Sequence, residues 1–146
     1  MRKNIILAVI TGLAFSAASA IGEDKVDFEK QIWPILKESC IKCHQPVYED
    51  ERGRSRRPKA DLIMTNKEGL VKGGEANEDA PNLTPGDPTK STYYTRLLLD
   101  LDDDEHMPPE DKAPQLTGDQ KKLLEKWIKD GADFGDWTEF TDLPVK

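Results

Sequence analysis

The sequence has few cysteines, a minority of basic residues and, after its first twenty residues, no long apolar run. Two cysteines among 146 residues are too few for a disulfide scaffold. There are 21 Lys and Arg against 28 Asp and Glu, which gives a formal net charge of -7. Since affinity for nucleic acid comes mainly from clustered Lys and Arg, this balance argues against a nucleic-acid-binding protein.

The first twenty residues have the pattern of an export signal. The basic pair Arg2-Lys3 precedes an apolar stretch over residues 5–15, and Ala18-Ser19-Ala20 supplies a cleavage site of small residues. The apolar stretch is shorter than the ~20 residues that span a bilayer. We therefore expect a signal peptide at residues 1–20 and a mature periplasmic domain at residues 21–146, without a transmembrane segment. An uncleaved membrane anchor is the alternative.

The remaining chain is patterned as helices joined by long polar loops, with no convincing alternating strand. Apolar residues fall on one helical face between Asp27, a plausible N-cap, and Ser39. Pro34 lies inside this pattern and predicts a kink or a late helix start. Gly86-Asp87-Pro88 is expected to open a second helix, with Leu98 on its apolar side.

The last predicted helix has the clearest boundaries. Thr117 and Gln120 match a capping box, in which each side chain satisfies a backbone donor of the other residue. Gly131 is well placed to end this helix. By contrast, residues 47–59 are rich in Glu, Asp and Arg, and predict a solvated loop. A docking patch is the alternative for this loop.

The residues that carry chemistry are Cys40-Ile41-Lys42-Cys43-His44. Cys-x-x-Cys-His is the attachment signature of c-type haem: the two thiols form thioethers with the two vinyl groups, and the histidine donates a nitrogen to the iron. A disulfide, a thioredoxin-like couple and half of a zinc site are the alternatives. The sequence has no other cysteine and one other histidine, so a zinc site lacks its remaining ligands.

A sixth iron ligand is offered by the segment Asp104-Glu105-His106-Met107-Pro108-Pro109. A thioether from Met107 raises the reduction potential and suits electron transfer, whereas His106 would give bis-histidine ligation. The two prolines fix the backbone beside either ligand. Met64 is a third conceivable ligand, although we expect it to lie in the core.

The order of these motifs resembles the Planctomycete-type cytochrome c domain. The stretches that carry the resemblance span nearly the whole mature chain, and they are Asp27-Phe28, Ile32, Pro34-Ile35-Leu36, Cys40 to His44, Lys59-Ala60-Asp61-Leu62, Pro85-Gly86-Asp87-Pro88, Ser91, Met107-Pro108-Pro109, Leu116-Thr117, Trp127-Ile128 and Gly131-Ala132. The resemblance implies a small all-α, cytochrome c-like fold with long loops around one covalently bound haem. It also implies that the distal ligand is Met107.

The resemblance therefore predicts an electron carrier with one haem c, held by Cys40 and Cys43 and ligated through iron by His44 and Met107. The sequence shows no pair of acid and base residues that would indicate a catalytic site. We expect redox partner proteins with a basic docking surface, because the chain is acidic. Two other functions remain open: a haem enzyme or gas-binding sensor with an open or His-ligated sixth site, and a haem-free interaction module with a Cys40–Cys43 disulfide.

Overall fold

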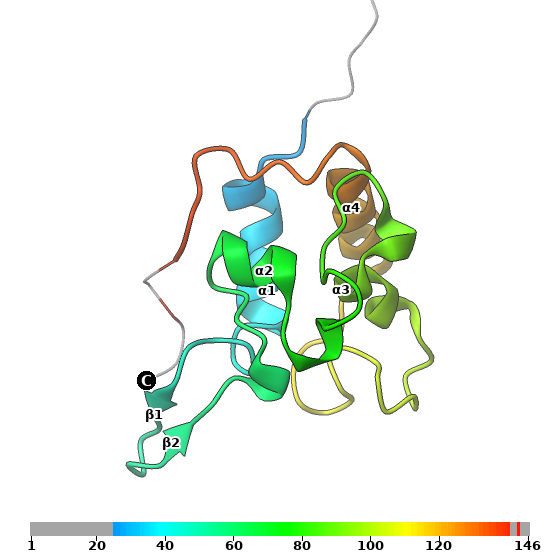
Figure 1. Cartoon of the computed structure of the whole chain (residues 1–146). Coiled ribbons are helices and arrows are strands. Elements are labelled where there is room, and N and C mark those ends of the chain that lie inside the picture. The colour runs from blue at the N-terminus through cyan, green and yellow to red at the C-terminus, as the bar shows by residue number, and fades with distance from the viewer. Residues whose placement is uncertain (1–24, 141–142, 144–146) are drawn as a thin grey trace, which may run out of the picture.

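Helical segments make up most of the regular structure in the computed structural model, which describes residues 25–140 and residue 143 (Figure 1). The expected helical class is therefore largely right, although a small two-stranded sheet is added to it. The predicted signal peptide at residues 1–20 lies outside the described residues. Within the described part, none of the helices is long and apolar enough to cross a membrane.

The first helical unit begins with a π-helical turn (Phe28–Ile32) and continues as α1 (Trp33–Ser39). Asp27 caps it as predicted, because its Oδ1 accepts the backbone N–H of Lys30 at 3.0 Å. Pro34 lies in the first turn of α1, where its missing N–H breaks no helical hydrogen bond. The helical segment already begins at Phe28, so a late helix start at this proline is wrong; the structure has instead a change from π-helical to α-helical winding at Trp33.

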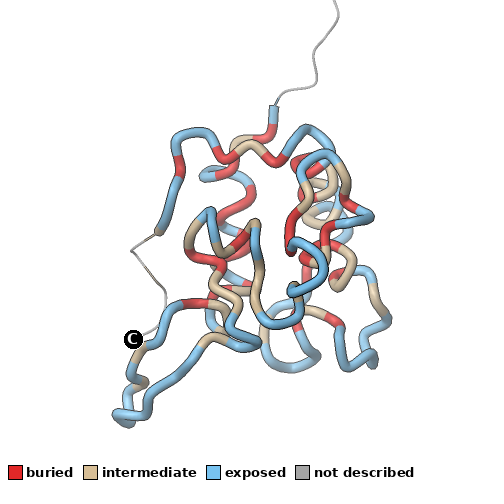
Figure 2. The backbone as a smooth tube through the Cα atoms, viewed as in Figure 1, coloured by how far each residue is buried: buried red, intermediate tan, exposed pale blue. Residues whose placement is uncertain are grey.

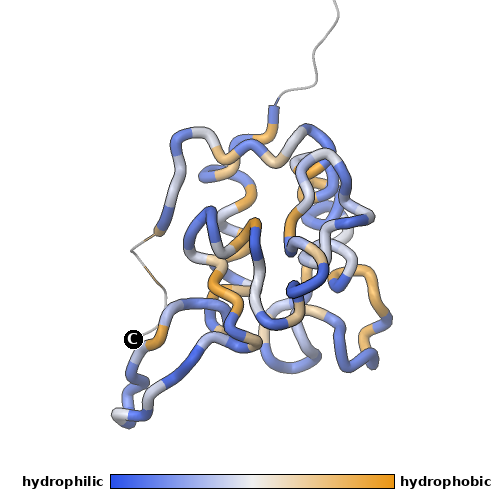
Figure 3. Tube along the Cα trace, in the orientation of Figure 1, coloured by the Kyte–Doolittle hydropathy of each residue, from blue (hydrophilic) through white to orange (hydrophobic). Residues whose placement is uncertain are grey.

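The charged segment 47–59 contains a β-hairpin that the sequence pattern did not predict. Strands β1 (Tyr48–Glu49) and β2 (Ser55–Arg56) pair antiparallel, with Tyr48 opposite Arg56. The hairpin extends away from the helical body (Figure 1), its residues are mostly exposed (Figure 2), and beyond Val47 they are mostly hydrophilic (Figure 3). The expected solvation is therefore right.

The middle of the chain is made of short helical pieces. Helix α2 (Lys67–Lys72) is followed by α3 (Thr92–Thr95), and α3 lies between 3-10 turns at Pro88–Lys90 and Arg96–Leu98. The second predicted helix does start beside the cap at Asp87, but it is broken. Ser91 is one cause, because its Oγ donates to the carbonyl of Asp87 at 2.9 Å and stabilises a turn there. The expected apolar side includes Leu98, which is instead 55% exposed.

Helix α4 (Gly118–Lys129) confirms the last sequence prediction in detail. Thr117 N–H donates to Gln120 Oε1 at 2.8 Å, and Gln120 N–H donates to Thr117 Oγ1 at 3.2 Å. Gly131 has φ of +99°, the left-handed conformation with which many helices end.

The core lies where the first helical unit meets α4 and the segment that follows α4. Phe28 contacts the rings of Trp127, Phe134 and Trp137, with ring centroids 5.2, 4.9 and 4.5 Å away. The Trp33 ring stacks on Phe140 at 3.8 Å. This aromatic cluster, defined here as Phe28, Trp33, Trp127, Phe134, Trp137 and Phe140, holds the first and last helices together.

Candidate functional site

Cys40, Cys43 and His44 lie on one helical turn directly after α1. The N–H groups of Cys43 and His44 both donate to the carbonyl of Cys40, each at 3.1 Å. Residues three and four positions apart in such a turn face the same side. Ile41, between the cysteines, is fully buried in the core and fixes the turn to the helical body.

The chain that returns from the hairpin supports this turn from the other side. Lys59 N–H donates to the carbonyl of Cys43 at 2.9 Å, and Met64 N–H donates to the carbonyl of His44 at 2.8 Å. The hairpin therefore lies between two segments, the Cys43–His44 turn and the chain from Lys59 to Met64, that are hydrogen-bonded to each other. Its position relative to Cys43 is fixed by these backbone contacts.

Cys40, Cys43, His44 and Met107, the four predicted site residues, line one cavity of about 460 Å³. This volume is within the ~300–1,000 Å³ that is typical of cofactor and small-molecule sites. Much of the remaining lining is apolar and comes from other loops and from the chain around α3; it includes Leu62, Met64, Tyr93, Leu97, Pro108, Pro109 and Ala113. The fold thus brings together residues that are more than sixty positions apart in sequence.

Partial burial shifts the pKa values of two titratable groups on this turn, His44 and Cys40. Burial lowers the pKa of His44, although nearby backbone groups of Leu62 and Lys59 act in the opposite direction. His44 Nδ1 is buried and has no hydrogen-bond partner among the described residues. Burial, and to a lesser extent the neighbouring Cys43, raises the pKa of Cys40 to about 12. A reactive thiolate couple requires the opposite shift, so this thiol is poorly suited to thioredoxin-like exchange.

Met107 and His106 are adjacent in sequence but have different surroundings. Met107 lines the cavity, and its N–H donates to the carbonyl of Arg96 at 3.1 Å. His106 does not line the cavity and is 4% exposed. Its Nδ1 lies 2.8 Å from the carbonyl oxygen of Leu99, and its Nε2 lies 2.9 Å from Gln115 Oε1. Both ring nitrogens of His106 are thus engaged away from the cavity.

Sequence reasoning missed two residues of the site. Gln115 donates through Nε2 to the carbonyl of Pro108 at 2.7 Å while its Oε1 faces His106, so one side chain holds both neighbours of Met107. Tyr93 lines the cavity and is buried, and its hydroxyl has no hydrogen-bond partner among the described residues. Neither residue belongs to a local motif, so no sequence signal marked them.

Charged residues and a second methionine also surround the site. Arg96 and Lys59 both line the cavity, and Arg96 pairs with Glu105 at 3.6 Å. Met64 is buried in the core, as expected, although it also borders the cavity. The aromatic residues Trp33 and Trp127 pack within the aromatic cluster, and the cavity contains Tyr93 instead.

These residues fit a haem. The cavity is lined by two thiols on one turn, by an imidazole beside them and by the thioether of Met107 from a later segment of the chain. The rest of its lining is largely apolar. Buried polar atoms without a partner require a reason. Both His44 Nδ1 and the Tyr93 hydroxyl are such atoms and belong to residues that line this cavity.

Comparison with known proteins gives one match. Residues 40–111, just under half of the chain, match the family described as Planctomycete cytochrome C. No curated protein and no solved structure matches the chain. The matched segment begins at the first cysteine of the cavity and includes His44 and Met107. Over residues 40–111, therefore, the match supports the resemblance seen in the sequence: this segment is similar to Planctomycete cytochrome C.

Proposed function

We propose that the chain is an exported monohaem c-type cytochrome that carries single electrons in the periplasm. The observation that carries this proposal is the shared cavity of Cys40, Cys43, His44 and Met107. A haem bound there would supply the one-electron chemistry of its iron. The family match over residues 40–111 supports a c-type cytochrome independently of the cavity.

Each site residue has a defined task in this proposal. Cys40 and Cys43 provide the sulfur atoms for two thioether bonds, and His44 provides an imidazole nitrogen from the same turn. Met107 provides a thioether from a loop whose backbone is bonded to Arg96. The apolar side chains of the lining exclude water, which limits the reorganisation that accompanies a change of charge.

Met107 is a better distal ligand than His106 in this arrangement. Its side chain borders the cavity, whereas the ring nitrogens of His106 face Leu99 and Gln115. Ligation by His106 would break both contacts, at a cost of about 0.5–1.5 kcal/mol each. A methionine ligand with histidine raises the potential and suits electron transfer.

The test is the optical spectrum, oxidised and then reduced, of the protein exported from a host that matures haem c. We expect a sharp reduced c-type spectrum, the weak ferric methionine–iron charge-transfer band, and no reaction of the reduced protein with carbon monoxide. Tight binding of carbon monoxide would instead favour a gas sensor or haem enzyme. A colourless product, beside a control cytochrome that matures normally, would overturn the proposal.

Two matched variants assign the ligand. Met107→Leu and Met64→Leu each replace a cavity methionine by a residue of similar volume, so the change in packing alone should cost neither more than ~1.5 kcal/mol of stability. We expect Met107→Leu to remove the charge-transfer band and to allow carbon monoxide to bind. Met64→Leu should keep the band. Loss of the band in Met64→Leu alone would contradict the assignment.

A further inference from the structure

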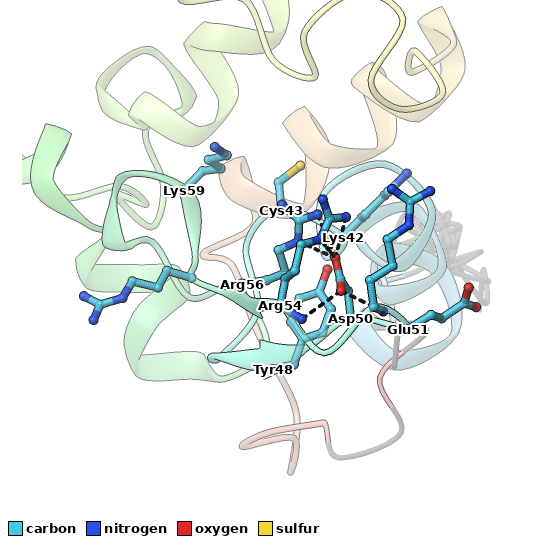
Figure 4. A pocket seen from close by; sticks show the side chains of 10 residues that line it. Lys42, Cys43, Tyr48, Asp50, Glu51, Arg54, Arg56 and Lys59 are labelled. Atoms are coloured by element: carbon cyan, nitrogen blue, oxygen red, sulfur yellow. Dashed lines mark hydrogen bonds and ion pairs between the residues drawn. The ribbon is translucent and has the colours of Figure 1, made fainter.

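A second cavity, of about 600 Å³, lies between the hairpin and the turn that carries Cys43 (Figure 4). Eight charged residues line it, six basic and two acidic, and we call them the basic hairpin face: Lys42, Arg52, Arg54, Arg56, Arg57 and Lys59, with Asp50 and Glu51. The whole chain has the opposite balance, with 21 basic and 28 acidic residues. The charge beside Cys43 is therefore opposite in sign to the net charge.

Asp50 organises two of the arginines. Its carboxylate accepts the Nε–H of Arg54 and of Arg56, each at 2.9 Å, and also accepts the backbone N–H of Arg52 and of Arg54, each at 3.0 Å. Figure 4 shows the two guanidinium groups gathered around this one carboxylate. These contacts, with those of Arg54 first, hold the pKa of Asp50 well below its usual value. The hairpin is thus tied by a carboxylate that remains ionised at neutral pH.

The other cations of the face are available for a partner. The side chains of Arg52, Arg57, Lys42 and Lys59 are on exposed residues, and none has an ion pair among the residues that the structure describes. A guanidinium group is a planar fork that matches the geometry of a carboxylate. Because the single charge of Asp50 compensates one of the two charges of Arg54 and Arg56, most of the uncompensated positive charge lies on these four residues.

The basic hairpin face is continuous with the cavity of the proposed haem site. Lys42, Cys43 and Lys59 line both cavities. A molecule bound to the face would therefore lie next to the cysteine end of the haem site. The acidic segment 100–105 lies at the Met107 end of the haem site. Glu105 pairs with Arg96, and the N–H of His106 donates to the carbonyl of Asp103.

We propose that the basic hairpin face is the docking surface for an acidic patch on a protein redox partner. The inference rests on the proposed electron-carrier function and concerns the partner at that same site. The net charge alone predicts a basic partner, but electrostatic steering near a binding site follows the local charge. The cations come from the connection between the two strands, from β2 and the chain that follows it, and from the turn that carries Lys42 and Cys43. This spread suits several carboxylates on one surface.

The first test measures binding of a fluorescent peptide of seven glutamates to the purified exported protein, by anisotropy at low and at high salt. Arg52→Ser/Arg57→Ser removes two charges and leaves the contacts of the Asp50 carboxylate in place. Lys72→Ser/Lys122→Ser is the matched control, because it changes the net charge equally and neither lysine lines the face. We expect binding to weaken about three- to tenfold in the arginine variant and to change little in the control.

The second test measures oxidation of the reduced protein, in which one electron passes to hexacyanoferrate(III) or, for comparison, to a cationic cobalt(III) tris-phenanthroline complex. The arginine variant should be oxidised more slowly than the wild type by the anionic reagent. Its oxidation by the cationic reagent should not be slowed. An equal slowing in the lysine control would show an effect of net charge and overturn the proposal. Self-association of the wild-type chain, if the arginine variant abolished it, would also overturn the proposal, because a second copy of the chain would then occupy the face.

The two proposals fail in different ways. Peptide binding is measured without any redox step, so a protein that lacks haem still reports on the basic hairpin face. A colourless protein that binds the peptide would overturn the electron-carrier function, and with it the redox role of the partner, but it would leave the basic hairpin face as a binding surface for carboxylates. A normal c-type spectrum together with unchanged peptide binding in the arginine variant would overturn the docking surface alone.

Discussion

The aromatic cluster and the cavity differ in how completely the chain fills them. In the cluster, rings from the first helical unit, α4 and the segment after α4 contact one another directly, and Trp127 is 1% exposed. Its Nε1 donates to the carbonyl of Asp133 at 2.8 Å. In the cavity, by contrast, apolar side chains surround open space, and the lining includes His44 and Tyr93, each with a buried atom that has no partner among the described residues.

This difference separates the residues that make the fold from those that make the site. Stability is expected to depend mainly on the cluster, because large buried rings contribute most of the apolar burial. Function is expected to depend on the cavity, where a cofactor would complete the packing. Substitutions in the two regions should therefore affect different measurements.

The largest effect is expected for Trp127→Ala. Loss of this buried ring should lower the free energy of unfolding by ~3–5 kcal/mol, as measured by urea denaturation of the exported protein. Met107→Leu is the comparison in the cavity; measured without haem, on the background in which both cysteines are alanine, it should cost less than ~1.5 kcal/mol, because it changes the packing alone. If Met107→Leu proved more destabilising than Trp127→Ala, the division between cluster and cavity would be wrong.

A smaller effect is expected for His106→Ala. His106 lies beside the cavity but bonds to Leu99 and Gln115, so its removal loses two hydrogen bonds of about 0.5–1.5 kcal/mol each and should cost ~1–3 kcal/mol of stability. The methionine–iron charge-transfer band should persist, since Met107 is untouched. Disappearance of the band with stability unchanged would make His106 the ligand and not a structural residue.

The cap of α4 gives a smaller change again. Thr117→Ala removes the acceptor for Gln120 N–H and should lower the free energy of unfolding by about 1 kcal/mol. Thr138→Ala, at an exposed threonine outside any helix, is the control and should stay within ~0.5 kcal/mol. Equal losses in both variants would show that the capping box does not stabilise the helix.

The smallest effect concerns pH and the hairpin. The pKa of Asp50 is lowered in the folded protein, so its contribution is complete above the unfolded value of ~3.9 and is lost as the pH falls through the lower folded value. The amide N–H groups of Arg52 and Arg54 should therefore keep their protection from hydrogen exchange down to about pH 4. Early loss of protection, near pH 6, would show that Asp50 does not tie the hairpin.

The sequence predicted the elements whose signals are local. The cap at Asp27 and the boundaries of α4 follow from backbone hydrogen bonding within a few residues, and both are present. The order of motifs also predicted that His44 and Met107 serve one site, and both line the cavity.

The parts that were missed depend on contacts between distant residues or on polar side chains without periodicity. The hairpin has no alternating apolar pattern, because it is tied by Asp50 and two arginines. The second helix is interrupted at Ser91 by hydrogen bonds to Thr84 and Asp87, which propensity does not register. Gln115 acts on Met107 through Pro108 and His106, and only the folded chain brings it there.

The intact mass of the exported protein under denaturing conditions tests the central claim most directly, provided that a control cytochrome matures in the same host. We predict the mass of a chain that begins at Ile21 plus one haem, retained because two thioether bonds join it to Cys40 and Cys43. Replacement of both cysteines by alanine should remove that added mass. A wild-type mass equal to the bare chain, with two thiols or one disulfide, would contradict the account.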